Sequence, residues 1–272
     1  MIFDGHIHTP FCPHGTTDTF EMYIEKALSL GLKGITFTEH APLPEGFEDP
    51  TPLKDSAMNL KDLSSYFETI EYLKEKYKKK IAIHAGLEVD YLIGFEEETK
   101  AFLNNWGKHL DDAILSVHFL PLNNQYYCLD YSEETFAEMI EKVGSAENIY
   151  RLYFSIVKKS IHADLGSYKP KRIGHITLVH KFKKQFPVSN YFEEQLIDLL
   201  TEIKAANYQL DYNGAGFVKP LCGDSYPSAW IVNEALKRKI PLIYGSDAHS
   251  AKGLGQGYNK LYLPHFAARP NL

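Results

Sequence analysis

The 272-residue chain has few arginines, few cysteines and no long apolar segment, and each shortage excludes a class of protein. Lysine and arginine total 29 against 35 acidic residues, whereas proteins that bind extended nucleic acid carry clustered basic residues. The three cysteines, Cys12, Cys128 and Cys222, are widely spaced and form neither a disulfide framework nor a CxxC pair. No apolar run approaches the roughly 20 residues that cross a bilayer, and no basic region followed by an apolar stretch stands at the N-terminus. We therefore expect a cytoplasmic protein that binds neither nucleic acid nor membrane, and composition leaves its oligomeric state open.

Seven short β-like runs alternate with longer helical patterns, which is typical of βα units around a parallel sheet. A hydrophobic content of 44% is ample for a packed core, and the length suits a single α/β barrel domain over residues 1–272. Helical patterns occupy, for example, residues 18–32 and 189–207. The β-like runs cover residues 2–8, 34–40, 80–91, 112–118, 172–176, 208–213 and 240–249.

Polar residues share one face of the first two runs. Asp4, His6 and His8 alternate with apolar or small residues, because successive side chains of a strand point to opposite faces. In the second run, Thr38 and His40 share a face in the same way. Strands covered by helices usually read as continuous apolar runs, so a polar inner line indicates residues that point into the mouth of a barrel.

Six of the seven runs end in residue types that bind metal ions. Active sites of (β/α) barrels lie at the carboxyl ends of the strands, so these side chains are expected to converge there. His14 would reach in from the first loop, and residues 41–58 and 119–131 form the longest irregular stretches, which we interpret as substrate walls. The strand-end candidates are His6, His8, His40, Glu88, His118, His175, Asp247 and His249.

Mixed imidazole and carboxylate ligands favour divalent ions, and two ions about 3.5–4 Å apart can clamp the attacking and leaving oxygens of a phosphate ester. A bridging carboxylate is then expected. Glu88 is the natural bridge, because it ends a central strand whose neighbours Ala85 and Gly86 leave space. This donor set suits zinc, iron and manganese alike.

The motifs "DGHIHTPFCPHG", "ITFTEHAPLP", "HAGLEVDY", "SVHF", "IGHITLV" and "GSDAHS" resemble those of the polymerase and histidinol phosphatase (PHP) superfamily, and in particular its monofunctional histidinol-phosphate phosphatases. The resemblance covers nearly the whole chain and implies a distorted seven-stranded (β/α) barrel with three divalent transition-metal ions. It implies one ion held by His6, His8, Glu88 and Asp247, a second by Glu88, His118 and His175, and a third by His14, His40 and His249.

The reaction implied by the resemblance is hydrolysis of a small phosphate monoester, L-histidinol phosphate, in histidine biosynthesis. A hydroxide between the first two ions would attack phosphorus, with Glu88 at the bridge. His249, Asp247 or His40 would protonate the leaving group, and spacing does not choose among them.

Phosphate binding is assigned to Arg151, where the family carries an arginine near the site. Members of the family often have a second arginine a few residues after the fifth-strand histidine. His180 or Lys181 stands there in this chain, which puts the second phosphate contact in doubt. Asp130, Glu133 and Asn213 remain alternatives for binding the imidazole and the amine of the substrate.

Two other functions stay open at this point. One is a different PHP phosphoesterase that acts on nucleotides or as a 3′ to 5′ exonuclease, against which the acidic composition counts. The other is a metal-binding module without catalysis, which would need neither a phosphate-binding cation nor long covering loops.

Overall fold

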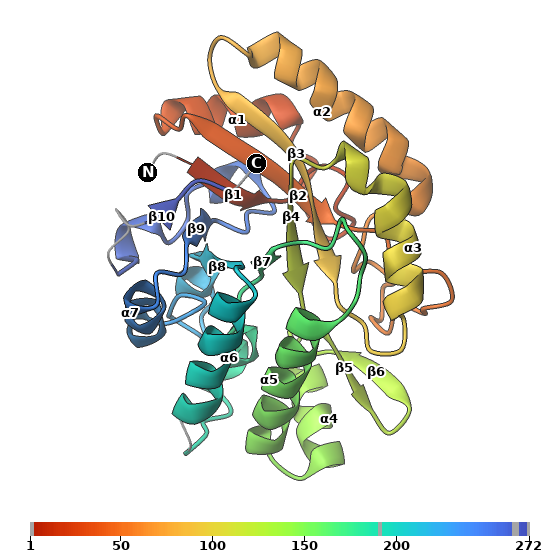
Figure 1. Cartoon of the computed structure of the whole chain (residues 1–272), viewed down its shortest axis with the longest axis vertical. Helices are drawn as coiled ribbons and strands as arrows, with labels where there is room; N and C mark the ends of the chain where they lie inside the picture. The colour runs from red at the N-terminus through yellow and green to blue at the C-terminus, as the bar shows by residue number, and fades with distance from the viewer. Residues whose placement is uncertain (1–2, 190–191, 263–266, 271–272) are drawn as a thin grey trace.

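The carboxyl ends of seven parallel strands meet at one end of a nearly closed barrel (Figure 1). The computed structural model describes residues 3–189, 192–262 and 267–270. Neighbouring strands in the sheet follow the order β1-β2-β3-β4-β7-β8-β9-β10, and each neighbouring pair is parallel. Their bounds are β1 Phe3–Ile7, β2 Gly34–His40, β3 Ala82–Asp90, β4 Asp112–Ser116, β7 Arg172–Ile173, β8 Gln209–Asn213, β9 Leu242–Gly245 and β10 Ala267–Ala268.

The first and last barrel strands meet where β1 and β9 end. Ile7 forms a parallel bridge with Ala248, and the backbone N–H of Asp247 donates to the carbonyl of His6 at 2.8 Å. The prediction of a distorted seven-stranded barrel is confirmed, and each of the seven predicted runs contains one of its strands. The eighth strand, β10, is a two-residue addition beside β9 that the sequence pattern did not indicate.

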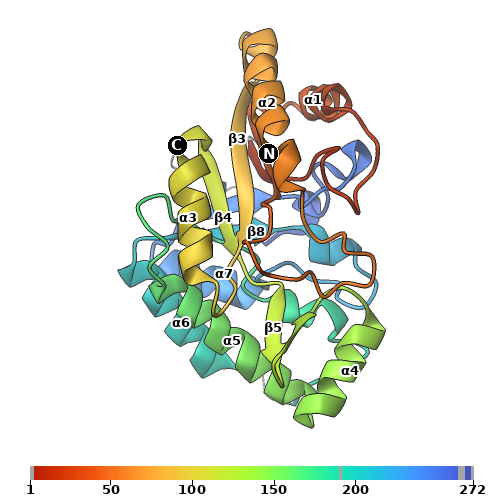
Figure 2. The ribbon, with the colours of Figure 1, turned by 90° about the vertical axis from the view of Figure 1, so that its right-hand side faces the viewer.

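Helices surround the strands (Figure 2). In the helix after β1, Phe20, Tyr23, Ile24 and Ala27 are buried at the spacing of one helical face, and the hydroxyl of Thr19 accepts a hydrogen bond from a backbone N–H of the first turn. The helices are α1 Phe20–Ser29, α2 Leu63–Tyr77, α3 Glu96–Trp106, α4 Glu133–Val143, α5 Ala146–His162, α6 Glu193–Ala205 and α7 Ala229–Lys237. Short 3₁₀ turns cover Leu60–Asp62, Gly107–His109, Leu178–Phe182, Ala215–Val218, Ala251–Gly253 and Tyr258–Lys260.

Residues 119–131 were predicted to be irregular, but they contain an antiparallel hairpin. Its strands are β5 (Phe119–Leu122) and β6 (Gln125–Cys128). Asn123 and Asn124 connect the two strands with positive φ angles of 50° and 65°. A two-residue turn of this kind needs a positive φ at both positions, which asparagine tolerates better than most residues. The hairpin follows β4 directly and therefore stands beside the site.

An ion pair fills the barrel interior at the amino ends of the strands, opposite the predicted ligands. Nη2 of Arg172 donates to Oδ2 of Asp112 at 2.6 Å and to the carbonyl of Gly5 at 2.8 Å. Thr36 donates to the same carboxylate. Burial raises the pKa of Asp112, and the guanidinium opposes that effect. At this end of the barrel, the polar inner face of β2 therefore contributes Thr36 as a hydrogen-bond donor to the buried ion pair.

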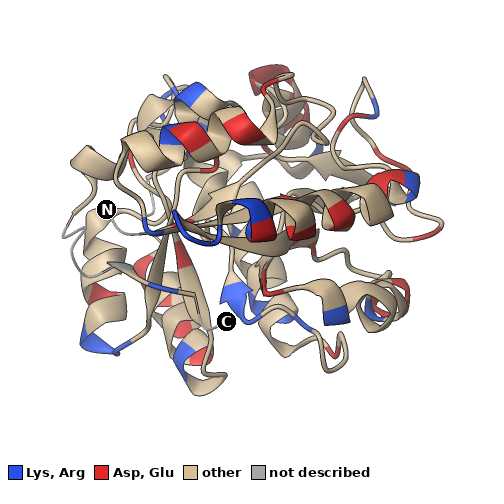
Figure 3. Ribbon diagram, turned by 90° about the horizontal axis from the view of Figure 1, so that it is seen from above, with Lys and Arg blue, Asp and Glu red and all other residues tan. Residues whose placement is uncertain are grey.

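Charged residues of both signs are interspersed over the helices (Figure 3). Among the residues described, no helix is both long enough and apolar enough to cross a membrane.

Candidate metal centre

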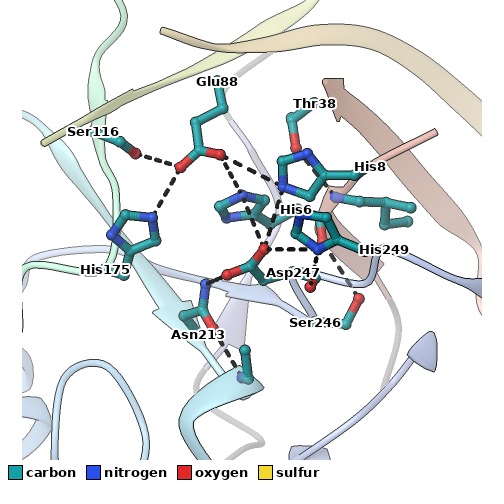
Figure 4. A network of polar contacts seen from close by, with 12 residues as sticks. His6, His8, Thr38, Glu88, Ser116, His175, Asn213, Ser246, Asp247 and His249 are labelled. Atoms are coloured by element: carbon teal, nitrogen blue, oxygen red, sulfur yellow. Dashed lines mark hydrogen bonds and ion pairs between the residues drawn. The ribbon is translucent and has the colours of Figure 1, made fainter. Parts of the chain in front are cut away.

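The strand-end residues named from the sequence converge at the carboxyl ends of the strands, and Figure 4 shows six of them pointing toward one another. Five of the eight line a cavity of about 440 Å³, and the other three, His6, His8 and Glu88, are buried against them. They arrive from the ends of β1, β2, β3, β4, β7 and β9, and His14 reaches the same place from the loop after β1. A volume of this size suits a small molecule rather than a polymer.

One oxygen of Glu88 faces the imidazoles of the first two strands. Oε2 lies 3.2 Å from Nε2 of His6, 3.5 Å from Nε2 of His8 and 3.3 Å from Nδ1 of His40. Only 1% of the Glu88 side chain is exposed. Burial alone would raise the pKa of this carboxyl, but the surrounding imidazoles, His6 first among them, hold it well below its usual range.

The other oxygen of Glu88 faces a different pair of imidazoles. Oε1 lies 2.9 Å from Nε2 of His175 and 3.7 Å from Nε2 of His118. Ser116 donates its hydroxyl to the same oxygen at 2.6 Å, and a Cβ at Gly174 would lie 2.0 Å from that hydroxyl. Glycine at 174 therefore leaves room for the contact that orients the carboxylate. With one oxygen towards each set, Glu88 has the disposition of a bridge between two ions.

Asp247, which follows the end of β9, lies beside the imidazoles of His6 and His8. Oδ1 lies 3.2 Å from Nε2 of His8 and 3.9 Å from Nε2 of His6, and Asn213 donates to Oδ2 at 3.2 Å. The backbone of Asp247 is left-handed, with a φ of 53°. Such conformations of residues other than glycine are costly and concentrate at functional sites. Burial would raise the pKa of this carboxyl, but His6 and His8 keep it well below its usual range, so it is ionised.

A third set consists of imidazoles. The rings of His40 and His249 lie 4.1 Å and 4.0 Å from the ring of His8, between centroids. The ring of His14 lies 5.0 Å from His40 and 4.9 Å from His249, and its Nδ1 is 2.7 Å from the carbonyl of Asp55. Burial, followed by the neighbouring His8, lowers the pKa of both His40 and His249 well below the usual value. Both rings are therefore neutral, with lone pairs free for an ion.

The residues present fit metal ions, because buried ligand atoms here lack hydrogen bonds. Buried polar atoms without partners are costly. Among the residues described, the unpartnered atoms of this set are His6 Nε2, His8 Nε2, both ring nitrogens of His40, His175 Nδ1 and Glu88 Oε2. Three groups of ligand atoms lie mutually within 4.8 Å: His6, His8 and Asp247; Glu88, His118 and His175; and His8, Cys12, His40 and His249.

Three buried carboxylates support the imidazoles from behind, and the sequence analysis missed all of them. Each lies near the Nδ1 of one ring, so that Nε2 points to the centre, which is the arrangement that orients histidine ligands in metalloproteins. The pairs are His6 with Asp211 at 2.9 Å, His8 with Glu39 at 3.3 Å and His118 with Asp90 at 2.8 Å. The position of Asp90, two residues after Glu88 on the same strand face, is a signal that could have identified it.

Of the predicted phosphate-binding residues, only Lys181 lines the cavity. Its ammonium donates to Oδ2 of Asp130 at 2.9 Å, and the lysine side chain is 19% exposed. Burial would lower the pKa of Lys181, but Asp130 raises it, so the lysine is charged. Lys219, in the loop after β8, also lines the cavity, and no motif in the sequence pointed to it.

The structure places Arg151 and His180 away from the lining of this cavity. Arg151 is exposed on α5 with its guanidinium 5.4 Å from the ring centre of Phe192, because the face of α5 that carries Tyr150 and Tyr153 is the buried one. The ring of His180 stacks on Tyr150 at 5.3 Å, and burial lowers its pKa to about 4. Neither residue lines the cavity.

Comparison with known proteins gives a family and close relatives. The PHP domain model matches residues 4–215. The chain is 51% identical over 257 residues to the histidinol-phosphatase of Bacillus subtilis (strain 168), covering 94% of this chain and 96% of that protein.

Two solved structures share the fold. The crystal structure of the hisK protein from Listeria monocytogenes has a TM-score of 0.91 and 40% identity, covering 96% of this chain and 100% of the other. The histidinol phosphate phosphatase of Lactococcus lactis subsp. lactis Il1403, complexed with zinc, L-histidinol and phosphate, has a TM-score of 0.67 and 21% identity, covering 92% of this chain and 87% of the other.

Proposed function

Because this chain belongs to the PHP domain family, we propose that it is a metal-dependent phosphatase that hydrolyses L-histidinol phosphate to L-histidinol and phosphate in histidine biosynthesis. The observation that carries the substrate assignment is the 51% identity to a histidinol-phosphatase over nearly the full length of both chains. The cavity and its convergent ligands supply the site that such an activity requires. A single catalytic domain over residues 1–272 and a cytoplasmic location are part of the same proposal.

The proposed centre holds three divalent ions, of zinc, iron or manganese. The first would bind to His6, His8, Glu88 and Asp247, the second to Glu88, His118 and His175, and the third to His14, His40 and His249. When bound, the ions supply Lewis acidity towards water and the phosphoryl oxygens. Two groups of close ligand atoms, His6 with His8 and Asp247 and Glu88 with His118 and His175, support the first two ions, and the closeness of His40 to His249 supports the third.

In the proposed reaction, Lys181 binds the phosphoryl group. Lys181 lines the cavity, and its ammonium is held in place by a hydrogen bond to the carboxylate of Asp130. A charge-assisted hydrogen bond contributes about 1.5–3 kcal/mol, which is enough to orient the ester. Lys219 supplies a second, more exposed positive charge at the same cavity.

Asp247, His40 and His249 remain the candidates for protonating the leaving group, and burial and their neighbours determine their ionisation states in the chain without ions. Asp247 is ionised and the two imidazoles are neutral, as ligands of an ion must be. In the chain without ions, none of the three is therefore a carboxylic acid or an imidazolium, and the two imidazoles keep only their ring N–H. Their other role in the proposed reaction is to bind ions.

A side-by-side assay of phosphate esters on one metal-replete preparation tests the function. A site that hydrogen-bonds a substrate group rejects analogues without it by up to about 10⁴–10⁵. We expect kcat/KM for L-histidinol phosphate to exceed that for a nucleoside monophosphate or an aryl phosphate by at least about 100-fold, or about 2.7 kcal/mol. Equal rates would leave a general phosphoesterase, preference for a 3′-recessed oligonucleotide would favour the exonuclease, and no turnover would favour a metal-binding module.

A further inference from the structure

We propose that Cys12 is a fourth ligand of the ion assigned to His14, His40 and His249, so that this ion is bound by sulfur as well as by imidazoles. This inference rests on the proposed three-ion centre. It goes beyond that proposal because nothing in the family motifs assigned the cysteine a role.

The first observation is the position of the thiol. Sγ of Cys12 lies in one group with ring nitrogens of His8, His40 and His249, all within 4.8 Å of one another. Cys12 is 5% exposed. The loop holds it there, since the N–H of Cys12 donates to the carbonyl of Thr9 at 3.0 Å, and a turn then leads to His14.

The second observation concerns the imidazoles around the thiol. His40 is 7% exposed, yet neither of its ring nitrogens makes a hydrogen bond within the described part of the chain. His8 is assigned to the first ion instead, because its Nε2 lies 3.2 Å from Asp247 of that set and its Nδ1 lies 3.3 Å from Glu39. Unpartnered buried ring nitrogens beside the thiol are ligand atoms that would fit an ion.

The other two cysteines show what an incidental thiol looks like here. Sγ of Cys128 lies 3.5 Å from Oδ1 of Asp130, and Cys222 belongs to the hydrophobic core. Neither belongs to a group of ligand atoms in the described residues. A buried cysteine usually packs as a small apolar residue, but Cys12 has imidazoles as neighbours.

Coordination by Cys12 is a simple exchange of bonds. The S–H bond breaks, the proton leaves to solvent, and a sulfur lone pair binds the ion without any change in oxidation state. A thiolate is a soft ligand, so the third position should favour zinc over manganese more strongly than the other two, which offer imidazole and carboxylate.

Cobalt(II) substitution tests this ligand independently of catalysis, because a cobalt–thiolate bond gives a charge-transfer absorption band in the near ultraviolet. We expect this band in the wild-type protein once the third equivalent of cobalt binds. Cys12→Ser should abolish the band, and it should also reduce the selectivity of the third equivalent for zinc over manganese. Cys128→Ser and Cys222→Ser serve as matched controls that keep the band.

The wild-type spectrum alone can overturn the proposal, so the test does not depend on whether Cys12→Ser folds. Three bound cobalt ions without a thiolate band would refute the sulfur ligand and leave the three-ion centre intact. Two bound ions without the band would refute both the third ion and its sulfur ligand. A band that survives in Cys12→Ser but disappears in Cys128→Ser would identify Cys128 as the sulfur ligand and refute the proposal for Cys12.

Discussion

Oδ2 of Asp211 lies 2.9 Å from Nδ1 of His6, on the far side of a ring whose Nε2 faces Glu88 at 3.2 Å. Asp211 is fully buried, and a Cβ at Gly245 would lie 2.5 Å from its Oδ1. The ring of His6 therefore lies between the carboxylates of Asp211 and Glu88. Asp211 fixes the orientation of the ring without facing the cavity.

Asp211→Asn is expected to weaken binding of the ion at His6 by about 10–100-fold, the usual effect of removing a partner behind a metal ligand. Metal retained after dialysis against a graded series of chelator concentrations measures this. Asp198→Asn, on the exposed side of α6, is the matched control and should retain metal as wild type does. Equal retention by both variants would mean that Asp211 does not orient the ligand.

Glu88→Gln should lose both metal and activity. The amide keeps the shape of the side chain but removes the charge that faces two sets of imidazoles. We expect fewer bound ions per chain by elemental analysis and a fall in kcat of at least about 100-fold. The control is Glu98→Gln, at an exposed position on α3. Full metal content with normal turnover would show that the bridge is misassigned.

Lys181→Met should lower kcat/KM by about 10–100-fold, the scale of one or two charge-assisted hydrogen bonds to phosphate. Metal content should not change, because an ammonium has no lone pair for an ion. Arg151→Met is the matched control, since Arg151 lies on the exposed face of α5, and its kinetics should match wild type.

Removing Lys181 also leaves Asp130 without its partner, which alone could lower stability. The double variant Lys181→Met/Asp130→Asn separates the two effects. It should recover the melting temperature of the wild-type protein without recovering kcat/KM. If activity returns with stability, Lys181 has a structural role only.

Metal binding should release protons at neutral pH. Burial would lower the pKa of His8 and His118, but neighbouring carboxylates raise these values to about 9 and about 10 in the chain without ions. Both rings then carry protons at pH 7 that an ion must displace. Calorimetric titration of zinc in two buffers of different ionisation enthalpy counts the protons released, and a result of zero would contradict these pKa values.

The same groups predict how stability depends on pH. A raised histidine pKa stabilises the folded chain below about pH 6.5, and this contribution is lost as pH rises through about 9 to 10. The ion-free protein should therefore lose stability in that range, while zinc affinity increases. We expect zinc to raise the melting temperature more at pH 9 than at pH 6. A larger rise in melting temperature at pH 6 than at pH 9 would contradict the raised pKa values of His8 and His118.

The barrel and the convergence of the candidate ligands could be predicted because both depend on local patterns. Alternation along β1 and β2 places His6, His8 and His40 on inner faces, and parallel strands bring their ends together. Thr19 and the apolar spacing after it define α1 in the same way.

The supporting residues could not be predicted, because their contacts are distant in sequence. Asp211 meets His6 across 205 positions, and nothing near either residue announces the other. The position of Arg151 follows from a local pattern. The apolar periodicity of α5 places Tyr150 and Tyr153 on the buried face and Arg151 on the exposed one.

The ion pair between Arg172 and Asp112 occupies the barrel interior at the end away from the candidate ligands. In the described part of the chain, these side chains and Thr36 fill the end of the barrel opposite the ligands. The cavity opens instead among the loops at the carboxyl ends of the strands. In the proposed reaction, substrate and product would occupy this same cavity, so we expect a bound product to compete with the next substrate molecule.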